Sequence, residues 1–98
     1  MAFEWDDAKN TANVRKRGIA FEEAIEIFNG QFLDLVDDRK DYGEIRRFAV
    51  GVVADRMLVV VYTIRRGDRR IISARRANSR ERKKYSPLLP RRSEAPQD

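Results

Sequence analysis

The stretch MLVVVYTIRRGDRRIISA, residues 57–74, decides the fold of this 98-residue chain. Residues 57–64 are its most apolar and β-branched segment, which predicts a central strand. The turn at residues 66–68 contains Gly67, which adopts a positive φ at no steric cost. It returns the chain into another strand over residues 69–74. Two strands joined by so short a turn pair antiparallel, so a β-sheet is the expected frame.

Two further strands are predicted upstream of this pair. Residues 32–37 and 45–53 alternate between apolar and polar or small residues, as in strands with one buried face. In the second of them Phe48 and Val50 point to the same side. The turn at residues 54–56 leads directly into the central strand, so four consecutive strands form an antiparallel meander.

Two helices are predicted before the strands. After a short aromatic segment at residues 3–5, Asp6 is suited to be the N-cap of a first helix that Gly18 terminates. A second helix is expected over residues 21–29, ended by Gly30. Its apolar residues recur at i, i+3, i+4 and i+7 and predict core positions: Phe21, Ala24, Ile25 and Phe28.

A third helix is predicted after the last strand. Asn78 and Glu81 have the spacing of a capping box, and Ser86-Pro87 ends the helix. Residues 86–98 are rich in proline and predict a flexible tail. The expected fold is therefore a single α+β domain over residues 1–85, in the order α-α-β-β-β-β-α. The first two helices cover one face of the sheet, and the third helix, the tail or a partner covers the other.

The composition excludes several kinds of site. The chain has no cysteine and no histidine, which removes disulfides, zinc-thiolate sites and the commonest general acid–base. Catalysis must use Arg, Lys, Glu, Asp, Tyr or Ser, and we expect neither a metal nor another cofactor. Because no apolar run approaches about 18 residues and no leader opens the chain, we expect a cytoplasmic protein without a membrane partner.

The charge is strongly polarised along the chain. Residues 1–44 hold 6 Lys/Arg and 11 Asp/Glu, a net charge of −5, whereas residues 65–92 hold 12 and 2, a net charge of +10. Such a basic third predicts an anionic partner, and the density of arginine favours phosphate groups. The alternative interpretation is a solvated charged face without a partner.

Several separated motifs resemble the BrnT toxin family. Residues 3–28 resemble the opening of these toxins, whose usual pattern is roughly F-x-W-D-x-x-K-x-x-x-N-x-x-K-H-G-[IV]-x-F-x-E-A, and the segments at residues 42–46, 60–63 and 72–85 complete the resemblance. The matching residues of the first motif are Trp5, Asp6, Lys9, Asn13, Lys16, Gly18, Phe21, Glu23 and Ala24. The chain departs from the pattern at Arg17, where the family usually has histidine.

The resemblance implies a type II toxin, a small RelE-like ribonuclease that blocks translation by cutting RNA. It also implies a neighbouring BrnA-type antitoxin of the ribbon-helix-helix class, with which the toxin forms a hetero-oligomer. We expect that antitoxin to cover the basic C-terminal region and the apolar sheet face that the helices leave open. The alternative is a non-catalytic nucleic-acid- or protein-binding module, such as a degenerate toxin, which the absence of histidine favours.

Metal-independent cleavage of RNA requires cations that neutralise the additional negative charge of the pentacoordinate phosphorane. Because strand residues alternate, Ser73 and Arg75 share one face. This predicts Arg75 as the phosphate ligand and Ser73 as its orienting partner. Arg80 is expected to reach the same phosphate from the third helix. Glu81 is either a general base or only a capping residue whose pKa its cationic neighbours lower. Tyr85 is an acid, a base-stacking ring or a packing residue.

Other cations are candidates for binding the RNA backbone. On the last strand and the third helix these are Arg76, Lys83 and Lys84. Lys9 and Lys16 on the first helix either line the cleft or are surface charges. Arg65 precedes the last turn, about 30 Å from Arg75 along an extended strand. It either binds the RNA backbone far from the phosphate held by Arg75 or only keeps the hairpin soluble.

Overall fold

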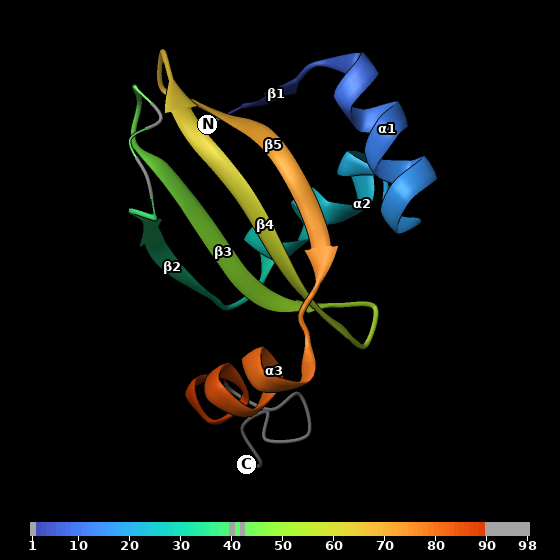
Figure 1. The fold of residues 1–98 in the computed structure, drawn as a ribbon, viewed down its shortest axis with the longest axis vertical. Helices are drawn as coiled ribbons and strands as arrows, with labels where there is room; N and C mark the ends of the chain where they lie inside the picture. Colours follow the sequence, from blue (N-terminus) through green and yellow to red (C-terminus); the bar gives the residue numbers. More distant parts are fainter. Residues whose placement is uncertain (1, 40, 42, 90–98) are drawn as a thin grey trace.

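The structure, a computed structural model, describes residues 2–39, 41 and 43–89. Its frame is a five-stranded mixed sheet in the order β1-β5-β4-β3-β2 (Figure 1). The strands are β1 (Phe3–Trp5), β2 (Phe32–Asp37), β3 (Arg46–Val53), β4 (Arg56–Arg65) and β5 (Asp68–Arg76). The helices are α1 (Asp7–Arg17), α2 (Phe21–Ala24) and α3 (Ser79–Tyr85), with 3₁₀ turns η1 (Ile25–Asn29) and η2 (Ser86–Leu88). The chain is therefore an α+β protein.

The predicted sheet lacked one strand. Strands β2 to β5 pair antiparallel in chain order, but β1 adds a fifth strand that runs parallel to β5. The prediction of four purely antiparallel strands was therefore wrong. Residues 3–5 are too few to display a period of two, so the sequence indicated only an aromatic lead-in.

The first helix begins and ends as predicted. Asp6 Oδ1 accepts hydrogen bonds from the backbone N–H groups of Ala8 and Lys9 at 2.8 and 3.2 Å. At the other end Gly18 adopts a left-handed conformation with φ 73°, which glycine tolerates without steric cost.

The second predicted helix is wrong in its second half. The α-helix ends at Ala24 and continues as the 3₁₀ turn η1. The fully buried residues are Phe21, Ala24 and Ile27, whose spacing of three suits a 3₁₀ repeat. Ile25 and Phe28, which the 3.6-residue stripe placed in the core, are only partly buried against it.

Apolar residues pack on both faces of the sheet. On the larger side α1, α2 and η1 cover a cluster that includes Ala49, Leu58, Val60, Tyr62, Ile71 and Ala74. On the other side a smaller cluster joins Val50, Val59, Ala77 and Tyr85. A bulge between Val61 and Tyr62 shifts the register of β4 against β5. Beyond the bulge, Val61 pairs with Ser73 and Val59 with Arg75.

The third helix closes one end of the smaller face. Asn78 and Glu81 form the predicted capping box, and Arg82 donates to the carbonyl of Ala77 at 2.8 Å. The helix ends at Tyr85, as the Ser86-Pro87 signal predicted, and η2 follows. The predicted tail thus begins with one turn of 3₁₀ helix, and residues 90–98 lie outside the described residues. Within the described part of the chain, no helix is long and apolar enough to cross a bilayer.

Candidate active site

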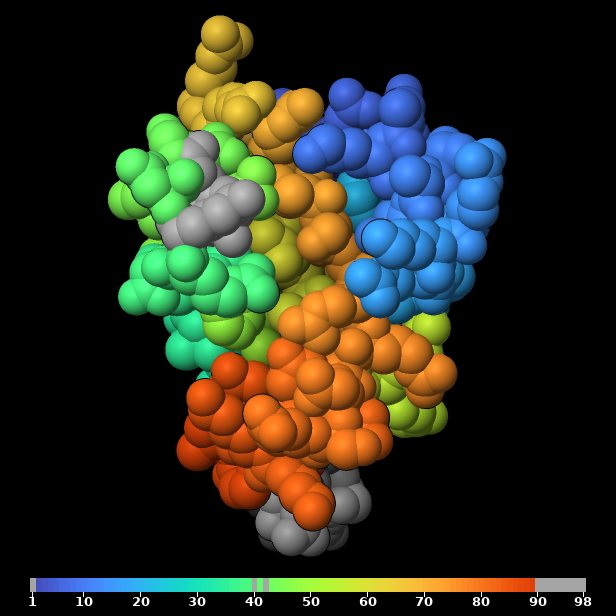
Figure 2. All heavy atoms as spheres, in the orientation of Figure 1, coloured from blue at the N-terminus to red at the C-terminus, as the bar shows by residue number. Residues whose placement is uncertain are grey.

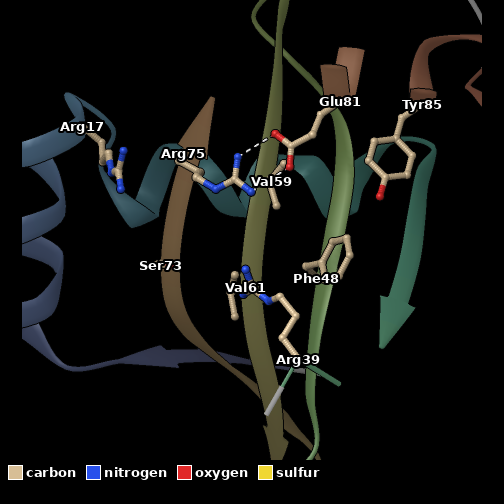
Figure 3. A pocket seen from close by; sticks show the side chains of 9 residues that line it. All are labelled: Arg17, Arg39, Phe48, Val59, Val61, Ser73, Arg75, Glu81 and Tyr85. Carbon is tan, nitrogen blue, oxygen red and sulfur yellow. Dashed lines mark hydrogen bonds and ion pairs between the residues drawn. The ribbon is translucent and has the colours of Figure 1, made fainter. Parts of the chain in front are cut away.

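The smaller face of the sheet carries a pocket of about 280 Å³ next to α3 (Figure 3). Residues from α1, the segment after β2, three strands and α3 converge on it, so it forms only in the folded chain. Its lining consists of Arg17, Arg39, Phe48, Val59, Val61, Ser73, Arg75, Glu81 and Tyr85. The space-filling view shows a recess between α1 and the segment that joins β2 to β3, with α3 below it (Figure 2).

Arg75 and Glu81 form a bidentate ion pair at the edge of the pocket. Arg75 Nη1 and Nη2 donate to the two carboxylate oxygens of Glu81 at 2.7 and 2.8 Å. The side chains are 31% and 22% exposed, so water screens the pair only in part. This pairing raises the pKa of Arg75, mainly through the hydrogen bonds to Glu81. The guanidinium is therefore fixed in charge and direction.

The carboxylate of Glu81 is held in its ionised form. Hydrogen bonds from Arg75 are the largest cause that lowers its pKa to about 2, followed in that direction by the N–H of Asn78 and the charges of Arg75 and Arg39. The pKa does move as the sequence predicted, but the chief cause is Arg75 rather than the cations of α3. So low a pKa opposes a general-base role for Glu81, whereas the capping role is confirmed.

Two further guanidinium groups face the same pocket. Arg17 is the last residue of α1, and Arg39 follows β2. Arg39 makes a bidentate ion pair of 2.7 and 2.8 Å with Asp37, whose side chain is only 1% exposed. In Figure 3, Arg75 lies between Arg17 on one side and Glu81 on the other.

The floor and one wall of the pocket are apolar. Phe48, Val59 and Val61 form the floor, and Tyr85 is 9% exposed and packs against Val59. The packing role predicted for Tyr85 is therefore confirmed, and its ring also lines the pocket. Ser73 lines it beside Arg75, as the alternation of β5 predicted.

The remaining candidates lie away from the pocket. Arg76 is exposed next to Arg75 but alternates to the other side of β5. Arg65 pairs with Glu44 at 3.3 Å at the far end of the sheet. Four more are exposed on helices and, within the described chain, do not line the pocket: Lys9 and Lys16 on α1, and Arg80 and Lys83 on α3. Lys84 is also exposed, with its ammonium 5.4 Å from the ring centre of Tyr85.

Sequence reasoning did not find two of the three pocket arginines as site residues. Arg17 stood out only as a departure from a family pattern, and Arg39 sits in a charged connection with no motif. No periodic spacing relates either of them to Arg75, because the closure of the fold brings them together. One signal was available in principle for Arg17, because the last turn of α1, which contains it, points toward the end of β5.

The pocket has the chemistry to hold an anion. The described residues of its lining include three guanidinium groups and one carboxylate, on an apolar floor that strengthens electrostatic interactions, and Arg39 is also paired with Asp37. Guanidinium groups bind phosphate oxygens with directed pairs of hydrogen bonds. Among the described residues, no three His, Cys, Asp or Glu side chains gather in a way that would hold a metal ion.

Comparison with known families agrees with this chemistry. The model of a family described as the ribonuclease toxin BrnT of type II toxin–antitoxin systems matches residues 5–81. That span includes most of the pocket, from Arg17 to Glu81, and ends before Tyr85. A search of curated proteins found no significant match. The chain belongs to the BrnT family of ribonuclease toxins of type II toxin–antitoxin systems.

Proposed function

We propose that this chain is a RelE-like, metal-independent endoribonuclease that inhibits translation in the cytoplasm, with the pocket around Arg75 as its active site. The observation that carries the proposal is the convergence of Arg17, Arg39 and Arg75 on one apolar-floored pocket. Among the described residues of that lining, Glu81 is the only carboxylate, and Arg75 already engages it. Cationic side chains thus take the charge-neutralising role that a metal ion has in other nucleases.

The reaction is an internal transfer at one phosphate of the RNA. The 2′-oxygen attacks the phosphorus and the bond to the 5′-oxygen breaks, which leaves a 2′,3′-cyclic phosphate and a 5′-hydroxyl. The proton of the 2′-hydroxyl passes to water. The 5′-oxygen takes a proton from the hydroxyl of Tyr85, which water then reprotonates. The additional negative charge on the phosphorane oxygens is met by the arginines.

Each pocket residue has a distinct role in this scheme. Arg75 binds the scissile phosphate, and Ser73 orients it by a hydrogen bond. Arg17 from the end of α1 and Arg39 from the segment after β2 add charge. Glu81 holds the guanidinium of Arg75 in direction and is displaced in part when the phosphate enters. The exposed cations of α3, Arg80, Lys83 and Lys84, bind flanking phosphates.

A BrnA-type antitoxin would neutralise the toxin by covering this face. Leu33, Leu35 and Phe48 are only partly buried, and Val52 is 44% exposed. Leu33 and Leu35 lie on the edge strand β2 and, with Phe48, continue the apolar face beyond the pocket. An antitoxin with apolar and acidic side chains fits this surface. Its binding excludes RNA from the pocket without a change in the conformation of the toxin.

Growth and cleavage assays test the proposal together. Induced expression of the toxin without its antitoxin should arrest growth and protein synthesis. Purified toxin should cleave RNA in excess chelator, and parallel assays with and without ribosomes define the substrate. RNA binding without cleavage under every condition would instead support the non-catalytic module. Activity that chelator removes and Mg²⁺ restores would contradict metal independence.

A further inference from the structure

The side chain of Asn13 joins α1 to the strand that carries Arg75. Its Nδ2 group donates to the carbonyl oxygens of Ile19 and Ala74 at 2.8 and 2.9 Å. Its Oδ1 atom accepts from the N–H of Ala74 at 3.2 Å. One half-buried amide thus satisfies three backbone groups from two segments 55 residues apart in the sequence. We infer that Asn13 is a positioning residue that fixes Arg17 and Arg75 relative to each other at the pocket.

The bonds to Ala74 fix the direction of Arg75. Ala74 lies between Ser73 and Arg75, and both of these neighbours point into the pocket. Strand β1 pairs with β5 only at residues 69–71. The amide of Asn13 therefore takes the place of a strand at Ala74, where it exchanges both backbone hydrogen bonds, as a residue of a neighbouring strand does. Holding both polar groups of Ala74 sets the orientation of the residues on either side.

The same side chain sets the position of Arg17. Arg17 follows Asn13 by four residues, so the two lie on the same face of α1, one turn apart. Because Asn13 bonds to β5, this face of the helix is turned toward the strand. The bond to the Ile19 carbonyl also holds the chain just after Gly18, where α1 ends. The positions of both arginines therefore depend on one amide.

Asn10 provides a matched control on the same helix. Its Oδ1 atom accepts from the N–H of Phe21 at 2.8 Å, and its Nδ2 group donates to Glu22 at 3.0 Å. These bonds tie α1 to α2 and do not touch β5. Loss of either asparagine therefore removes hydrogen bonds from α1, but only loss of Asn13 releases the strand that carries Arg75.

The inference rests on the proposed ribonuclease function, and its test includes a measurement that needs no activity. In ¹H–¹⁵N spectra of the free toxin, Asn13→Ala should shift the side-chain Nε–Hε signals of Arg17 and Arg75, whereas Asn10→Ala should leave them in place. In cleavage assays corrected for the folded fraction, Asn13→Ala should lower kcat about 10- to 100-fold with little change in KM. Asn10→Ala should leave kcat of the folded protein unchanged.

A double-mutant cycle separates positioning from general loss of stability. In the Arg17→Ala background, Asn13→Ala should lower kcat by a smaller factor than in the wild type, because one of the two groups it positions is already gone. Asn13→Gln retains the amide but displaces it by one methylene, so it should shift the Arg75 signal even if alanine reduces the folded fraction.

The outcomes distinguish the two claims. A wild-type protein that does not cleave RNA would overturn the proposed function. The Nε–Hε signals of Arg17 and Arg75 would still test the positioning role of Asn13. If Asn13→Ala and Asn13→Gln leave the signals of Arg17 and Arg75 where they are, the positioning role is wrong whatever the cleavage rate. An equal loss of kcat in both backgrounds of the cycle would also overturn it.

Discussion

The guanidinium of Arg75 and the carboxylate of Glu81 form a bidentate ion pair, with nitrogen–oxygen distances of 2.7 and 2.8 Å. This pair joins the last strand to the last helix and fixes the direction of the guanidinium to which we assign the scissile phosphate. It also places a carboxylate where two oxygens of a phosphate group would bind. If RNA binds here as we propose, it must compete with Glu81 for the same donors.

The first prediction concerns this competition. Glu81→Gln removes the ionised acceptor and should tighten binding of an oligonucleotide with 2′-O-methyl groups, which cannot be cleaved, about tenfold, equivalent to about 1.4 kcal/mol. Fluorescence anisotropy at constant salt measures the affinity. Glu26→Gln is the control, because this exposed carboxylate accepts a hydrogen bond from Asn29, is not among the residues that line the pocket and loses the same charge. Equal affinities for the two variants would contradict the competition.

The second prediction concerns the stability in acid. The pKa of Glu81 is about 2 in the folded protein, against an ordinary 4.5. A lowered folded-state pKa adds stability that is fully present above pH 4.5 and is lost as the pH falls toward 2. Allowing for solvent screening, the wild type should lose about 1–2 kcal/mol through this group between about pH 6 and pH 3.

Urea unfolding at the two pH values measures this loss. In Glu81→Gln the corresponding contribution should be absent, so the free energy of unfolding should fall less than in the wild type. Glu26→Gln should retain the wild-type pH dependence. An unchanged pH dependence in Glu81→Gln would show that the ion pair with Arg75 does not lower the pKa of the carboxyl.

Most of the frame was predictable because its signals are local. Three signals depend only on neighbours within a few residues: the alternation of apolar and polar residues over 32–74, the left-handed glycine after α1 and the capping box of α3. The missed elements depend on tertiary contacts. Residues 3–5 form a strand only because they pair with the edge of β5. The 3₁₀ turn η1 follows the sheet surface beneath it, where Ile27 packs against Gly51.

The site was predictable in part for the same reason. Alternation along β5 placed Ser73 and Arg75 together, and this pairing is confirmed. Arg17 and Arg39 join them only through the packing of α1 and the pairing of β2 with β3, which no spacing in the sequence reveals. Arg80 looked well placed because it follows the Asn78 cap at the N-terminus of α3, a position that favours anions. Its side chain instead leaves the helix toward solvent.

The third prediction concerns a close backbone approach under η1. A Cβ atom at Gly51 would lie 2.8 Å from Ile27 Cγ1 and 3.2 Å from the carbonyl oxygen of Gln31. Gly51→Ala should therefore destabilise the fold by about 1–3 kcal/mol, as overpacked core positions do. Thermal unfolding measures the change. Gly30→Ala is the control, because a Cβ there meets no atom within 4 Å, and an equally large loss in that variant would contradict the packing argument.

The fourth prediction concerns the antitoxin. If it covers the pocket face, it should compete with RNA, and its association rate should fall as salt rises because the basic region attracts it. Stopped-flow association at several salt concentrations and competition with a 2′-O-methyl oligonucleotide measure both effects. Toxin saturated with antitoxin that still binds RNA with full affinity would require inhibition from a remote site.

Arg75 and Arg76 provide the most direct test of the central claim, because neighbouring arginines on one strand point to opposite faces and only Arg75 lines the pocket. The decisive measurement is the rate of RNA cleavage in excess chelator by the wild type, Arg75→Ala and Arg76→Ala at equal folded concentration. The pocket around Arg75 predicts a loss of about 10²–10³-fold for Arg75→Ala, about 2.7–4 kcal/mol of transition-state stabilisation, and a rate near that of the wild type for Arg76→Ala. Equal rates for Arg75→Ala and the wild type would contradict the account.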